Sequence, residues 1–71
     1  MNRPTLGIIG GGQLGSLLAD AAKKIGIKTV ILSDDINAPA KNFSGKFIYG
    51  NYNDQNIIDE FINSVDLVTY E

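Results

Sequence analysis

The sequence contains no cysteine and no histidine among its 71 residues. The first absence excludes a disulfide framework and a thiolate metal site. The second removes the commonest general base and the commonest metal ligand, and with them the usual serine and cysteine catalytic triads. A catalytic centre built on any of these groups is therefore excluded.

Basic residues and long apolar runs are also scarce. Six scattered Lys and Arg residues against eight acids give a net charge of −2, so nucleic acid is not an expected partner. No apolar run approaches the roughly 18 residues of a membrane span, and no secretory signal precedes the first strand-like run. With 44% apolar residues, the composition predicts one small, soluble domain that does not contact a membrane, and a cytoplasmic location.

The hydrophobic period alternates along the chain. Short apolar runs predict buried strands at 6–9, 29–32, 47–49 and 67–70. Apolar residues at helical spacing predict one helix over 13–25, ended by Gly26, and a second that Asn53 or Asp54 caps. The inward stripes are Leu14, Leu17, Leu18, Ala21 and Ile25 in the first helix, and Ile57, Ile58, Phe61, Ile62 and Val65 in the second.

This order predicts an α/β fold: a Rossmann-like, mostly parallel four-stranded sheet with strand order 3-2-1-4, flanked by helices. The last strand then lies beside the first, and ligands bind at such a switch point. The last strand also leaves Leu67 and Val68 poorly shielded at an edge. We therefore expect residues 1–71 to be a single domain at the front of a larger protein; the alternative is a complete small protein that buries this edge in an oligomer.

A glycine-rich turn joins the first strand to the first helix. Gly10, Gly12 and Gly15 satisfy the pattern G-x-G-x-x-G. The first glycine permits a tight turn, the second lets backbone approach a phosphate, and the third lets the helix pack close to the strand. Free N–H groups at the helix start favour an anion. The alternative is a strand-to-helix turn that binds nothing.

Two acidic residues follow the second strand. Asp34 and Asp35 lie about 20 residues beyond the glycines, where a dinucleotide-binding domain places the acid that holds a ribose hydroxyl. The residues alone therefore leave open the alternative that the chain is an NAD(P)-binding Rossmann half-domain of an oxidoreductase. The other reading is that both acids are polar turn residues.

Three blocks of the sequence carry a family resemblance. Residues 8–15 read I-I-G-G-G-Q-L-G, residues 37–40 read N-A-P-A, and residues 68–71 read V-T-Y-E. In this order and spacing they resemble the N-terminal, pre-ATP-grasp domain of N5-carboxyaminoimidazole ribonucleotide synthetase. That family comprises ATP-grasp ligases of purine biosynthesis, which use ATP and bicarbonate to carboxylate aminoimidazole ribonucleotide.

The resemblance implies a substrate-binding domain. Its expected contacts to the ribonucleotide are Gly11, Gly12, Gln13, Leu14 and Glu71. Of these, Leu14 also begins the apolar stripe, which predicts that it belongs to the core. ATP and Mg²⁺ are expected in the remaining domains of a longer chain, so the 71 residues alone should be inactive. A homodimer is compatible with the family, and neither nucleic acid nor membrane is an expected partner.

Aromatic residues are read as packing residues. Their spacing is irregular and no basic residues alternate with them, so base stacking is not indicated. This prediction covers Phe43, Phe47, Tyr49, Tyr52 and Phe61. A structural or interaction role without any ligand remains the third class of function.

Overall fold

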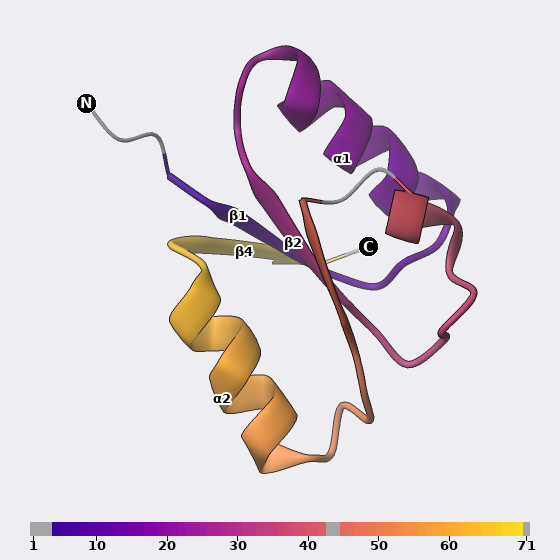
Figure 1. The fold of residues 1–71 in the computed structure, drawn as a ribbon, viewed down its shortest axis with the longest axis vertical. Helices are drawn as coiled ribbons and strands as arrows, with labels where there is room; N and C mark the ends of the chain where they lie inside the picture. Colours follow the sequence, from indigo (N-terminus) through magenta and orange to yellow (C-terminus); the bar gives the residue numbers. More distant parts are fainter. Residues whose placement is uncertain (1–3, 43–44, 71) are drawn as a thin grey trace.

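The computed structural model describes residues 4–42 and 45–70, which form a parallel sheet with helices on both faces (Figure 1). In chain order the elements are β1 (Leu6–Ile9), α1 (Gln13–Lys24), β2 (Thr29–Ser33), the 3-10 helix η1 (Pro39–Asn42), β3 (Lys46–Tyr49), α2 (Gln55–Ser64) and β4 (Leu67–Tyr70). The strands pair in the order β3-β2-β1-β4, and each pair is parallel. The predicted α/β class and strand order are confirmed.

The core has two layers, one on each face of the sheet. Strand β2 is buried along its whole length because its side chains alternate between these layers. Toward α1 and η1, the buried cluster is Ile8, Ala19, Ile31 and Ala40. Toward α2, it is Val30, Leu32, Ile48 and Phe61.

Helix α1 packs through small residues, and the predicted stripe is wrong for most of its members. The buried residues of the helix are Gly15, Ser16, Ala19 and Ala22. Leu18 packs against the core from a partly buried position. Small side chains let a helix approach its neighbours closely, and the larger residues then lie on its flank. Exposed fractions on that flank are 52%, 63% and 62% for Leu14, Leu17 and Ile25, and Ala21 is exposed as well.

Helix α2 follows its prediction more closely. Of the two predicted caps, Asp54 is the N-cap, and its side chain accepts a hydrogen bond from the N–H of Asn56 at 3.0 Å. Phe61 is buried in the core, and the partly buried residues Ile57, Ile58 and Val65 pack against the same cluster. Ile62 is 54% exposed, so its predicted inward position is wrong.

Candidate functional site

The glycine turn lies at the carboxyl end of β1. The N–H of Gly10 donates to the carbonyl of Leu32 at 2.8 Å, which fixes the start of the turn against β2. Gly10 has φ 109°, a value that L side chains rarely adopt, so the first glycine makes the tight turn as predicted. Gly12 has φ −77° and is the N-cap of α1 without a side-chain capping bond. Its backbone is one that any residue can adopt.

Gly11 is buried against its own protein. Its carbonyl accepts a hydrogen bond from the N–H of Ala40 at 3.0 Å. A Cβ atom added at this position would lie 2.5 Å from the Cβ of Ala38 and 3.0 Å from the Oγ of Ser33. Gly11 is therefore glycine because the segment after β2 packs directly on the turn. This packing requirement was not anticipated from the motif.

A small hollow opens beside this turn. Its volume is about 170 Å³, and it is lined by Gly11, Gly12, Ser33, Asp34, Asp35, Ala38, Pro39 and Tyr52. The described lining residues include two acids and no base. Such a hollow can accept hydrogen bonds from hydroxyl or amine groups, whereas a phosphate in it would meet like charge.

Tyr52 is a lining residue that the sequence did not identify. It was read as a packing aromatic, but it lies in the loop between β3 and α2 and is 39% exposed beside the hollow. Phe47 is partly buried, Phe61 is buried and Tyr49 is exposed. Phe43 lies outside the described residues.

The two acids after β2 have different surroundings. The Oδ1 of Asp35 accepts a hydrogen bond from the N–H of Asn37 at 2.9 Å, and the N–H of Asp35 donates to the Oγ of Ser33 at 3.1 Å. Asp35 therefore shapes the turn that follows β2, as the polar-turn reading held. Asp34 is exposed at the rim of the hollow.

Two of the remaining candidates, Gln13 and Leu14, begin helix α1. Gln13 is the first residue of α1 and is exposed. Leu14 is 52% exposed, so the prediction that it belongs to the core is wrong, and its side chain is open to contact. Glu71 lies outside the described residues. The register of β1 and β4 sets Tyr70 beside Ile9, which brings the end of β4 next to the glycine turn.

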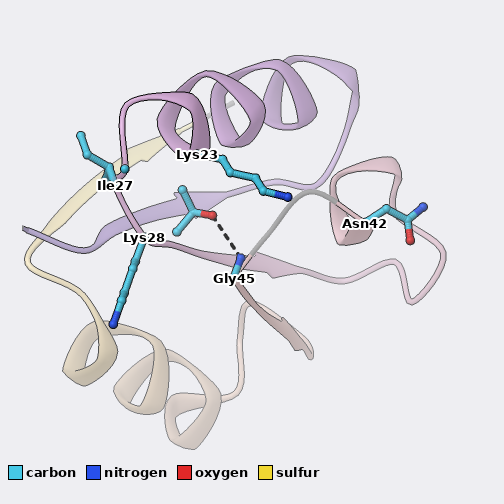
Figure 2. A pocket seen from close by; sticks show the side chains of 7 residues that line it. Lys23, Ile27, Lys28, Asn42 and Gly45 are labelled. Atoms are coloured by element: carbon cyan, nitrogen blue, oxygen red, sulfur yellow. Dashed lines mark hydrogen bonds between the residues drawn. The ribbon is translucent and has the colours of Figure 1, made fainter.

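A larger hollow lies at the opposite end of the sheet (Figure 2). It has a volume of about 340 Å³ and includes Lys23, Lys28 and Asn42 in its lining. The two lysine side chains point in different directions, and the hydroxyl of Thr29 accepts a hydrogen bond from the N–H of Gly45 at 3.3 Å. Ligands of open α/β sheets bind at the carboxyl ends of the strands, so the hollow beside the glycine turn is the better candidate.

Metal and membrane features are not found in the part of the chain that the structure describes. Residues 4–42 and 45–70 contain no group of three or more His, Cys, Asp or Glu side chains that could hold a metal ion. None of the helices in these ranges is long and apolar enough to cross a bilayer.

Comparison with known proteins decides the family. Residues 3–71 match the ribonucleotide synthetase preATP-grasp domain. The chain belongs to this family. It is 40% identical over 67 residues to the N5-carboxyaminoimidazole ribonucleotide synthase of Staphylococcus epidermidis and 39% identical to that of Staphylococcus aureus. The match covers 94% of this chain and 18% of either relative, so the chain spans less than a fifth of their length.

Solved structures of this family share the fold. The Staphylococcus aureus N5-carboxyaminoimidazole synthetase, complexed with ADP, superposes with a TM-score of 0.91 at 38% identity over 96% of this chain and 18% of that one. The synthetase of Thermotoga maritima gives a TM-score of 0.89 at 32% identity, over 97% of this chain and 19% of that one. The family resemblance is confirmed, and the NAD(P)-binding alternative is not favoured.

Proposed function

We propose that this chain is the N-terminal domain of an N5-carboxyaminoimidazole ribonucleotide synthase and helps to hold aminoimidazole ribonucleotide. The longer enzyme would be an ATP-grasp ligase of the cytoplasm that carboxylates this substrate with ATP and bicarbonate in purine biosynthesis. The 40% identity to the Staphylococcus epidermidis synthase is the observation that carries the proposal. The open glycine turn at the switch point of the sheet supports it.

ATP and Mg²⁺ are assigned to the rest of the longer chain. The hollow beside the glycine turn suits neither group, because Asp34 and Asp35 line it and none of its described lining residues is basic. A triphosphate placed in this hollow would meet like charge from both carboxylates. No acidic cluster for a metal ion is present in the described ranges either. The 71 residues alone should release no ADP from ATP.

The proposed ribonucleotide contacts surround the glycine turn. Gly12, which has no side chain, lets a ligand come close to the backbone, and the exposed Gln13 offers side-chain hydrogen-bonding groups. Both lie at the start of α1, where the helix dipole favours the negative charge of a nucleotide phosphate. The acid-lined hollow on the β2 side suits hydroxyl or amine groups of the same substrate. The proposed ribonucleotide contacts also include Gly11, Leu14 and Glu71. Gly11 contributes by letting the segment after β2 pack on the glycine turn.

The test uses a longer chain in which residues 1–71 replace the matching segment of the Staphylococcus epidermidis synthase. In this chimera Gln13→Ala should lower kcat/KM for aminoimidazole ribonucleotide by about tenfold, the loss expected for one hydrogen bond to a charged or well-positioned group. The KM for ATP should not change. Lys24→Ala, at the far end of the same helix, is the matched control. An inactive chimera, or a Gln13→Ala effect on ATP alone, would contradict the proposal.

A further inference from the structure

Another hollow lies at the amino ends of the strands, on the face of the sheet that α2 covers. Its volume is about 450 Å³, which is within the usual range of small-molecule pockets. The described lining residues include Lys28 and Lys46 and no acid, the reverse of the hollow beside the glycine turn. We call it the lysine hollow.

Both lysines lie on the α2 face of the sheet. Val30 belongs to the buried cluster toward α2, and Lys28, two residues earlier, shares its face. Figure 2 shows the Lys28 side chain extending toward α2. Lys46 pairs with Val30 in the register of β2 and β3, so it lies on this face as well. Two ammonium groups on neighbouring strands therefore border one hollow.

Neither positive charge is closely neutralised. Lys28 is exposed and forms no ion pair with an acid of the described residues. The Nζ of Lys46 lies 4.0 Å from the Oε2 of Glu60, and both side chains are more than half exposed, so this pair contributes little. Like charges on neighbouring strands repel each other, so stability of the sheet does not explain why both are lysine.

The inner wall of the lysine hollow is less polar than its rim. Val30 lines it and is 5% exposed. At the end of α2, the hydroxyl of Ser64 donates to the carbonyl of Glu60 at 2.7 Å, so its oxygen can only accept from a ligand. The carboxylate of Asp66, beside the hollow, accepts a hydrogen bond from the N–H of Thr5 at 2.7 Å. The arrangement combines an apolar wall with two cations at the rim.

We propose that the lysine hollow binds a small organic anion, a phosphate or carboxylate group attached to an apolar body. Lys28 and Lys46 hold the anionic group, since charge-assisted hydrogen bonds are the stronger ones, and the apolar body lies against Val30. The hollow is at the opposite end of the sheet from the glycine turn. It is a second ligand site, and it does not rest on the proposed function.

The competing explanation gives both lysines a structural role. The last turn of α2 contains no basic residue, and cations near the carboxyl end of a helix are favourable. Lysine on an edge strand such as β3 also discourages pairing with other chains. In either role, substitution of a lysine would change stability or association and would leave ligand binding unaffected.

A chemical-shift titration of the ¹⁵N-labelled 71-residue chain tests the site at constant ionic strength. Phenyl phosphate and benzoate carry the two anionic groups on the same ring, and the tighter of them identifies the preferred group. At least one should shift the amides of Val30 and Lys46 saturably. Inorganic phosphate, which lacks the apolar body, and benzyl alcohol, which lacks the charge, should each bind about tenfold more weakly.

Charge variants add a prediction of opposite sign. Lys28→Ala and Lys46→Ala should each weaken binding by about tenfold. Lys24→Ala should leave it unchanged, because Lys24 pairs with Asp20 on α1. Glu60→Gln should tighten binding by about two- to threefold, since it releases Lys46 from its only described ion pair. Asp20→Asn makes the same change in net charge beside Lys24 and should have no effect.

Three results would overturn the proposal. The first is the absence of a saturable shift with either aromatic anion. The second is a Lys28→Ala variant whose Tm changes while its affinity does not, which would establish the structural role. The third is an equal gain from Glu60→Gln and Asp20→Asn, which would show a general charge effect. Shifts confined to Gly12 and Gln13 would also contradict the lysine hollow, and they would leave the proposed function standing.

Discussion

Replacing Gly7 by alanine should destabilise the domain by overfilling the contact between β1 and α2. A Cβ at Gly7 would lie 2.7 Å from Cζ of Phe61 and 3.0 Å from both methyl groups of Val65. Overpacking of a well-packed core costs about 1–3 kcal/mol. The backbone of Gly7 is not in the left-handed region, so alanine also recovers about 0.4–1 kcal/mol by restricting the unfolded chain. The overpacking cost is larger than this entropic gain, so the free energy of unfolding should fall by about 1–2 kcal/mol in total.

The predicted loss is a measurable part of the domain's total free energy of unfolding. At about 0.05–0.15 kcal/mol per residue, a domain of 71 residues has roughly 4–11 kcal/mol of stability. A change of 1 kcal/mol moves the Tm of such a domain by about 4–8 °C, so Gly7→Ala should lower the Tm by roughly 4–16 °C. Urea unfolding followed by circular dichroism gives the free energy, and a thermal scan gives the Tm.

The control is a double-mutant cycle with Phe61→Leu, which removes the ring atom nearest to the new methyl group. If the two side chains compete for one space, the double variant should be at least about 0.5 kcal/mol more stable than the sum of the single effects predicts. A Gly7→Ala variant with unchanged or increased stability would refute the described packing of α2 on β1. Additive effects of the two substitutions would refute the claim that the new methyl group and the Phe61 ring compete for the same space.

Three further predictions concern the caps and the ligand. Asp54→Ala should cost about 0.5–2 kcal/mol because it removes the side-chain cap of α2, while Asn53→Ala should be near neutral; equal urea midpoints for the two variants would contradict this. Gly26→Ala should cost on the order of 1–2 kcal/mol because φ is 77° there, and a variant as stable as the parent in the same assay would show that the turn relaxes. The chain should show no saturable NADH or NADPH binding by fluorescence titration; micromolar affinity that Asp34→Ala abolishes would restore the dinucleotide reading.

The sheet could be predicted from the sequence because its signals are local. Strands β1 and β2 contain short, continuous apolar runs that stop at Gly10 and at Ser33, and such runs are typical of strands buried on both faces. The strand order followed from the right-handed crossover rule combined with the reversal after β3. No long-range information was needed at either step.

The buried face of α1 could not be predicted from hydrophobicity. The helix offers two stripes, one with Leu14 and Leu17 and one with Ala19 and Ala22, and the leucine stripe is the more apolar. Close packing against the sheet and η1 selects the smaller residues instead. That choice depends on how near η1 lies, which no pattern within the helix contains.

The glycine turn was located from its motif, but the hollow beside it was not. Gly12 and Asp34 could be placed at the carboxyl ends of β1 and β2 from the sequence. Pro39, at the start of η1, and Tyr52, in the loop between β3 and α2, reach the same hollow from two separate segments. The paths of such segments depend on turn contacts such as the one that Asp35 makes with Asn37. Loop paths of this kind are set by tertiary contacts and have no periodic signal.

Steady-state kinetics of Gly12→Ala in the chimera test the central claim, that the glycine turn holds the ribonucleotide. Because φ at Gly12 is −77°, alanine fits the backbone, and the variant should stay folded in a thermal melt. If the ribonucleotide lies against Gly12 as proposed, the added methyl group would displace it, and a misplacement of about 1 Å at a positioning site can cost on the order of 100-fold in rate. The account predicts a loss of that order in kcat/KM for aminoimidazole ribonucleotide with the KM for ATP unchanged. A folded Gly12→Ala enzyme with unaltered ribonucleotide kinetics would contradict it.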